Sequence, residues 1–157
     1  MKTILKYLVC FVLLSTFTQA FAQQKSTQTK PKFKPPVVKV YLGGHSNGDS
    51  ISKETAKLLL PLPLLILDSK NTEYKVENYQ FLYRKKSYIP GAKTGKEEVA
   101  FTISAGIFKE TPLPKIWIDN VGFNLLNGEE FYFFDIIVKD KQGNRFLAPD
   151  YKLFISK

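Results

Sequence analysis

The sequence has few of the residue types that build most catalytic and metal sites. Among its 157 residues there is one cysteine, Cys10, and one histidine, His45. A zinc site needs three or four nitrogen, sulfur or oxygen ligands, so only carboxylates could join His45 in one. Serine or cysteine nucleophiles need a base that a third group orients. A serine–lysine pair is left open, but nothing marks one, and we expect no enzyme, no metal site and no cofactor.

Two acidic pairs are the remaining candidates for catalysis. Paired carboxylates can hydrolyse a glycoside, and the pairs here are Glu97-Glu98 and Glu129-Glu130. Each pair lies where a predicted strand begins, a place where acidic side chains are commonly solvated. We therefore expect both pairs to lie in solvent and assign them no hydrolytic role.

Long apolar runs are also missing beyond the first residues. Lys2 and Lys6 precede the apolar stretch Tyr7–Phe17, and Ala20-Phe21-Ala22 is a small-residue cleavage signal. The stretch is too short to span a membrane comfortably. The pattern predicts a secretory signal peptide at residues 1–22 and a periplasmic or secreted protein. The alternative is that the signal is not cleaved. In that case it would anchor the chain to a membrane, and we expect no other membrane contact.

Cleavage after Ala22 would also remove Cys10, so an exported chain would be stabilised by its core without disulfides. It would leave 21 basic residues against 14 acidic ones, from 23 and 14 in the full sequence. Five of the lysines precede the first acidic residue, Asp49: Lys25, Lys30, Lys32, Lys34 and Lys39. Residues 23–36 therefore read as a disordered basic linker. Because the basic charge is concentrated there, we expect no nucleic-acid partner.

Residues 37–157 are predicted to form a single β-sandwich domain. The strongest signal is the run from Phe131 to Val138, which is aromatic and β-branched and is followed by a Gly-containing turn. Positions 132, 134, 136 and 138 are apolar, so we expect that face to be core. The opposite face is interrupted only by Asp135, which places this strand in the middle of a sandwich.

Other stretches predict further elements. Ser52–Leu60 reads as one short helix that Ser52 caps and Pro61 ends. The apolar phase slips by one residue near Asn78, which predicts a β-bulge. Alternation from Val99 to Ala105 predicts a half-buried strand, and Ile116–Ile118 a short strand.

Folded basic residues gather at the end of one predicted strand and in the loop that follows it. A soluble strand end is one interpretation of this cluster, and an acidic protein or polysaccharide partner is the other. A tryptophan farther along the chain, with exposed tyrosines, could offer stacking platforms to a sugar. The candidate partner-binding residues are Arg84, Lys85, Lys86, Tyr88, Lys93 and Trp117.

Several loose motifs occur in a fixed order over about residues 38–155. They are Val38-x-Val40-x-x-Gly43-Gly44, Gly48-x-x-Ile51-Ser52-Lys53, Tyr74-x-Val76-x-x-Tyr79, Leu126-x-Gly128-x-x-Phe131-x-Phe133-x-Asp135-Ile136, Lys139-Asp140-Lys141-Gln142-Gly143-Asn144-Arg145 and Leu147-x-Pro149. In this order and spacing the chain resembles the C-terminal domain of GldM, a gliding-motility and type IX secretion protein.

The resemblance implies an immunoglobulin-like β-sandwich that makes protein–protein contacts without catalysis. The chain lacks the long helical periplasmic region of full-length GldM. We therefore expect a standalone exported module that binds an envelope or secretion-system protein, with homo-oligomer formation left open. A carbohydrate-binding or adhesive β-sandwich is the alternative.

Overall fold

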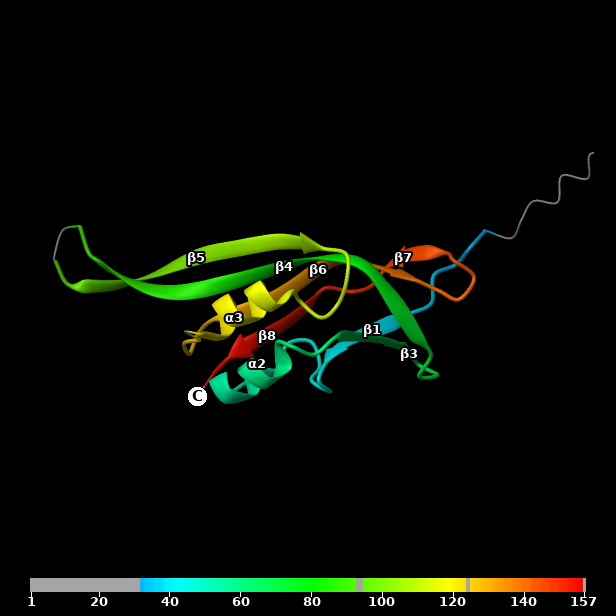
Figure 1. Cartoon of the computed structure of the whole chain (residues 1–157), viewed down its shortest axis with the longest axis horizontal. Coiled ribbons are helices and arrows are strands. Elements are labelled where there is room, and N and C mark those ends of the chain that lie inside the picture. Colours follow the sequence, from blue (N-terminus) through cyan, green and yellow to red (C-terminus); the bar gives the residue numbers. More distant parts are fainter. Residues whose placement is uncertain (1–31, 93–94, 124, 157) are drawn as a thin grey trace, which may run out of the picture. The chain divides into compact units, whose positions relative to one another are not determined.

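The computed structural model describes residues 32–92, 95–123 and 125–156, and the fold begins at Phe33 (Figure 1). The predicted signal peptide, most of the predicted linker and Lys93 lie outside this part. The elements, in chain order, are β1 (Val38–Leu42), β2 (Ser50–Ile51), α2 (Lys53–Leu59), β3 (Leu64–Asp68), β4 (Glu73–Pro90), β5 (Glu97–Phe108), α3 (Lys115–Phe123), β6 (Glu130–Lys139), β7 (Arg145–Leu147) and β8 (Tyr151–Ile155).

The strands form one curled sheet. Its main path runs β1-β3-β4-β6-β8-β2, with β5 joined to β4 and β7 joined to β6. All pairings are antiparallel except that of β2 with β8. The prediction of a mainly β fold is confirmed, whereas the immunoglobulin-like sandwich stays a prediction.

The longest strand, β4, carries the predicted bulge. Its pairing with β6 shifts register between Val76 and Asn78 and again between Asn78 and Gln80. Val76 is buried before the shift, and Tyr79, Phe81 and Tyr83 are buried after it. The extra residue keeps apolar side chains on the core face from Val76 to Tyr83.

A second irregularity, which the sequence did not reveal, lies in β6. Asp135 has a φ of 48°, in the left-handed region, and its carboxylate accepts a 2.7 Å hydrogen bond from Gln80 Nε2. Phe131 and Phe133 are buried before it and Ile136 and Val138 after it. The prediction that positions 132 and 134 are core is therefore wrong, because the phase of β6 changes at Asp135.

Replacing Asp135 tests this backbone conformation. A β-branched residue is strained at positive φ, so we expect Asp135→Val to lower the free energy of unfolding by about 1–3 kcal/mol. Asp135→Asn keeps a short polar side chain that tolerates this region and should stay within about 0.5 kcal/mol of wild type. Urea unfolding measures both. Equal stability of the two variants would contradict a strained position.

The loop from Gly43 to Asp49 joins β1 to the far side of the sheet. Gly48 N and the side-chain oxygen of Asn47 hydrogen-bond the backbone of Lys152 in β8 at 2.9 and 2.8 Å. Gly43 has a φ of 56°, and a Cβ there would lie 2.2 Å from a Leu59 methyl. The position therefore requires glycine, because its backbone passes directly over α2.

Two helices accompany the sheet in the described part of the chain, and one of them was not predicted. In α2 the side chain of Ser52 accepts a hydrogen bond from Thr55 N at 3.1 Å, which confirms the predicted N-cap. Ile116–Ile118, predicted as a strand, lies in α3, where Trp117, Ile118 and Val121 pack toward the core. No helix among the described residues is both long and apolar enough to cross a membrane.

Candidate functional site

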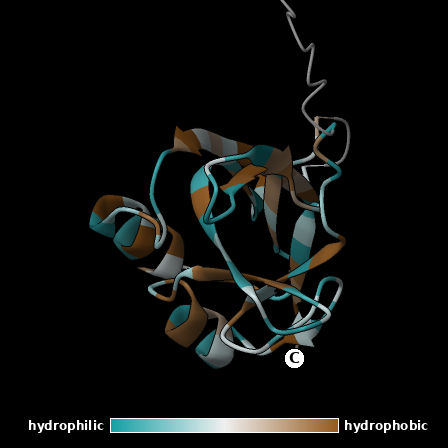
Figure 2. Cartoon of the chain, turned by 90° about the vertical axis from the view of Figure 1, so that its right-hand side faces the viewer, coloured by the Kyte–Doolittle hydropathy of each residue, from teal (hydrophilic) through white to brown (hydrophobic). Residues whose placement is uncertain are grey.

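The sheet has an apolar surface that faces away from the core. The prediction that Val99–Ala105 forms a half-buried strand is wrong in its burial, because Val99, Phe101, Ile103 and Ile107 are 41–74% exposed. These side chains lie on the face opposite the buried Phe81 and Tyr83, as alternation along paired strands requires. Figure 2 shows hydrophobic colour on the strands as well as on the helices.

This surface, which we call the outer face, is ordered in rows across four strands. One row runs from Ile103 through Arg84 and Glu130 to Phe154, and the next from Ala105 through Leu82 and Tyr132 to Lys152. A third row includes Ile107, Gln80 and Phe134. The outer face therefore combines aliphatic, aromatic and basic side chains. Its members are Gln80, Leu82, Arg84, Lys86, Tyr88, Val99, Phe101, Ile103, Ala105, Ile107, Glu130, Tyr132, Phe134, Lys152 and Phe154.

Arg84 and Lys152 make ion pairs and cation–π contacts at the centre of the outer face. The Arg84 guanidinium carbon lies 3.7 Å from the centre of the Phe101 ring, and Arg84 Nη1 lies 3.8 Å from Glu130. Lys152 Nζ lies 3.3 Å from the same carboxylate and 4.3 Å from the centre of the Tyr132 ring. One carboxylate thus faces two cations, and both cations lie over aromatic rings. The cluster carries a net positive charge.

Two aromatic rings extend the cluster along β6. The rings of Tyr132 and Phe134 stack with centroids 4.9 Å apart and an interplanar angle of 17°. The Tyr132 hydroxyl donates to Asp150, and this bond, with a smaller effect of burial, raises the pKa of Tyr132 to about 12. Tyr132 therefore stays protonated at neutral pH, and its ring is fixed in place by the bond.

A buried carboxylate supports the outer face from below. Glu129, expected in solvent, is 1% exposed. It accepts hydrogen bonds from the Tyr83 hydroxyl at 2.5 Å and from the backbone N–H groups of Lys86 and Leu126 at 2.9 Å each. Burial, and then the bond to Glu129, raises the pKa of Tyr83. The three donors explain the burial, since a buried carboxylate needs such partners.

The predicted site residues separate in the structure. Arg84, Lys86 and Tyr88 lie on the outer face, and Lys86 Nζ lies 5.4 Å from the centre of the Tyr88 ring. Lys85 is directed to the opposite face by strand alternation. Trp117 packs edge-on against Phe81 and Phe108, with centroids 5.9 and 5.3 Å away.

Sequence reasoning missed Phe101, Glu130, Tyr132 and Lys152 as members of the site. The alternation of β5 showed that Phe101 lies on an apolar face, but it did not show that this face is exposed. The other three join Arg84 only through strand pairing over long sequence distances.

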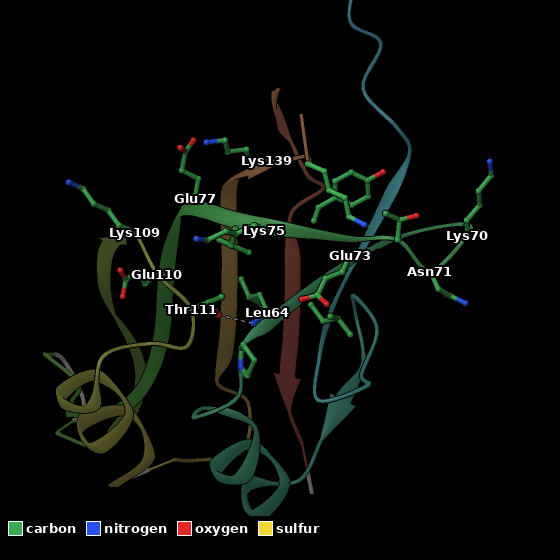
Figure 3. Close-up of a pocket in the computed structure, with 16 residues that line it drawn as sticks. Leu64, Lys70, Asn71, Glu73, Lys75, Glu77, Lys109, Glu110, Thr111 and Lys139 are labelled. Carbon is green, nitrogen blue, oxygen red and sulfur yellow. Dashed lines mark hydrogen bonds between the residues drawn. The ribbon is translucent and has the colours of Figure 1, made fainter. Parts of the chain in front are cut away.

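A groove lies where the sheet forks. β3 pairs with β4 at Glu73 and Tyr74, β5 pairs from Tyr79 onward, and the groove of about 1120 Å³ opens between them. Lys75, Glu77, Lys109, Glu110 and Lys139 surround it, and Leu64 N donates to Thr111 Oγ1 at 2.8 Å (Figure 3).

The groove is open, and its charges are mixed. Arg145 already pairs with Glu77 at 2.6 Å. Among the described residues, no group of three or more His, Cys, Asp or Glu side chains could hold a metal ion. The outer face is therefore the stronger candidate, since binding surfaces combine aromatic rings with arginine.

Fold and site together describe a mainly β protein with an exposed sheet face that is both apolar and basic. No protein-family model matches the chain, and no curated protein matches it.

Proposed function

We propose that the chain is a non-enzymatic, exported protein–protein interaction module of the cell envelope. The observation that carries the proposal is the outer face, where Arg84, Phe101, Tyr132 and Lys152 stand together on a rigid sheet. Arginine and aromatic residues are enriched at the energetic centres of protein interfaces. A patch of exposed apolar side chains on one face is typical of an interaction site.

The proposed relation is to the GldM C-terminal domain, as an immunoglobulin-like module, and the proposed partner is an envelope or secretion-system protein. The ordered motifs between Val38 and Pro149 support this relation. The outer face carries Arg84, Lys86 and Lys152, and three carboxylates contact it: Glu130, Asp135 and Asp150. Arg84 and Lys86 on β4 favour a partner surface with acidic side chains.

A carbohydrate-binding or adhesive module is the second candidate. The stacked pair Tyr132 and Phe134 favours it, because a sugar ring can lie on an aromatic platform. Trp117, the stacking platform that the sequence suggested, packs against Phe108, so less of its ring is accessible to a sugar. Protein recognition is therefore the stronger proposal.

Affinity capture from envelope extract tests the proposed surface. We expect the Arg84→Gln/Lys86→Gln double variant to recover about tenfold less partner than wild type, because it removes two cations that complement an acidic partner. Raising the salt concentration should weaken wild-type capture, since these charges are solvent-exposed.

The matched control is Lys53→Gln/Lys57→Gln, which removes the same charge from α2. It should recover as much partner as wild type. Equal recovery by both double variants, at every salt concentration, would contradict the outer face as the partner-binding surface. A glycan array on the wild-type chain examines the second candidate directly.

A further inference from the structure

Strand β5 is an edge strand without the usual protection. It pairs with β4 over its whole length, and no other strand of the described residues pairs with it. Edge strands are commonly protected by lysine, proline or a bulge. Residues 99–107 contain no charge and no proline, and their register with β4 is unbroken.

The free backbone groups of β5 can be assigned by their phase. Gly91 N donates to Lys96 O at 2.8 Å, so Lys96 belongs to a hydrogen-bonded pair. Such pairs alternate along an antiparallel ladder, so the even-numbered residues of β5 direct their N–H and C=O groups toward β4. The odd-numbered residues direct theirs to the free edge: Val99, Phe101, Ile103, Ala105 and Ile107. Their side chains are exposed too.

From this geometry we propose that a second copy of the chain pairs with β5 antiparallel about a two-fold axis at Ile103. Partner residues then have numbers that sum to 206. Ile103 faces itself, Phe101 faces Ala105, and Val99 faces Ile107, so apolar side chains meet only apolar ones. On the other face Thr102 meets Ser104, Ala100 meets Gly106, and Glu98 meets Phe108.

Charge complementarity selects this register. Glu97 begins β5 and Lys109 follows its last residue, so continuing the register by one residue places Glu97 of one copy opposite Lys109 of the other at each end. Moving the axis to Thr102 places Glu97 opposite Ile107. Moving it to Ser104 places Lys109 opposite Val99. Such a two-fold contact is self-complementary and closed, so it ends at a dimer.

The dimer would join two outer faces into one surface. The exposed residues of both β5 strands would lie at its centre, and Arg84 of each copy would flank them. This inference does not depend on the identity of the envelope partner, because it concerns the edge of β5 and not the rows beyond it.

Cysteine cross-linking of the full chain, with Cys10→Ser so that no other thiol is present, tests the register. Hydrogen-bonded antiparallel pairs have Cα atoms about 5.5 Å apart, within the range that a disulfide spans. We expect Ile103→Cys to form a disulfide-linked dimer under mild oxidation. Ile107→Cys is a similarly exposed control. By itself it should form at least about tenfold less disulfide-linked dimer than Ile103→Cys, but it should cross-link to Val99→Cys when the two variants are mixed.

Sedimentation at increasing concentration tests the association itself. Wild type should be dimeric at high concentration, and Ile103→Lys should be monomeric, because it places like charges opposite each other. Ile103 is 65% exposed, so circular dichroism and the thermal midpoint should match those of wild type.

Several outcomes would overturn the proposal. A wild-type chain that is monomeric at all concentrations excludes the dimer. An Ile103→Lys variant that still dimerises, or Ile107→Cys cross-linking as fast as Ile103→Cys, excludes this register. Slow hydrogen exchange of the odd-numbered β5 amides in a monomer would contradict a free edge in the single chain. Slow exchange only with a captured partner would assign it to that partner.

Discussion

Replacing Glu129 with alanine is expected to lower the free energy of unfolding by about 3–5 kcal/mol, the cost of leaving buried polar partners uncompensated. The substitution removes three hydrogen bonds at once and leaves the Tyr83 hydroxyl and the N–H groups of Lys86 and Leu126 without an acceptor. Since domains are stable by only about 5–15 kcal/mol, this is a large share of the total. Urea unfolding followed by circular dichroism measures it.

A conservative variant separates charge from shape at this position. Glu129→Gln keeps the side-chain volume. Both carboxylate oxygens of Glu129 accept hydrogen bonds from N–H donors, so the amide nitrogen of glutamine would face an N–H donor whichever way the amide is turned. We expect it to fall between wild type and Glu129→Ala. Glu97→Gln, in the exposed acidic pair, serves as the control and should change stability by less than about 0.5 kcal/mol. Equal effects at positions 97 and 129 would contradict a structural role for the buried carboxylate.

Trp117→Ala is expected to cost about 2–4 kcal/mol of stability, because large-to-small changes at packed aromatic positions leave a cavity. The indole fills the space above Gly106, where an added Cβ would lie 3.0 Å from its ring, and it contacts both Phe81 and Phe108. Thermal unfolding measures the loss. Ile116→Ala, a neighbour on the same helix with 67% exposure, is the matched control and should be nearly neutral.

The same variant distinguishes the two proposed functions. If Trp117 acts as packing, Trp117→Ala lowers stability and leaves the capture of a protein partner by the folded chain unchanged. A glycan array on which wild type binds and folded Trp117→Ala does not would instead favour the sugar-binding candidate, and a thermal midpoint equal to that of wild type would contradict the packing role.

The phase slip in β4 could be predicted from the sequence, but the slip in β6 could not. In β4, Tyr74 and Val76 alternate with charged residues, so the move to Tyr79 and Phe81 is visible as a change of phase. In β6 nearly every position is apolar, and a period of two carries no information there. Asp135 was the one polar residue in that run, and it marks the irregularity.

Helix α3 was missed because local propensity pointed to a strand. Ile116, Trp117 and Ile118 are β-branched or aromatic, which favours extended structure in isolation. The helix instead places Trp117 and Val121 on one side, four residues apart, toward the core. Lys115 and Asp119 form an exposed pair at 2.8 Å on the same helix. Tertiary packing thus outweighs propensity here.

The candidate site was predicted in part. A run of consecutive basic residues suggested one patch, but in a strand neighbouring residues point to opposite faces, which separates Lys85 from Arg84 and Lys86. Glu130 and Lys152 join Arg84 through two strand pairings that no local pattern contains. The exposure of β5 likewise depends on the absence of a covering element among the described residues, and alternation alone cannot show that.

The order of strand pairing also bears on how the chain folds. β4 and β5 are joined by a short connection, so their ladder forms with little loss of loop-closure entropy. β2 pairs with β8 across about a hundred intervening residues, Ser50 with Phe154. The entropy of closing that loop favours the β4–β5 hairpin as an early event and the β2–β8 ladder as a late one. The part of the outer face that lies on β4 and β5 would then form before the β2–β8 ladder closes the sheet.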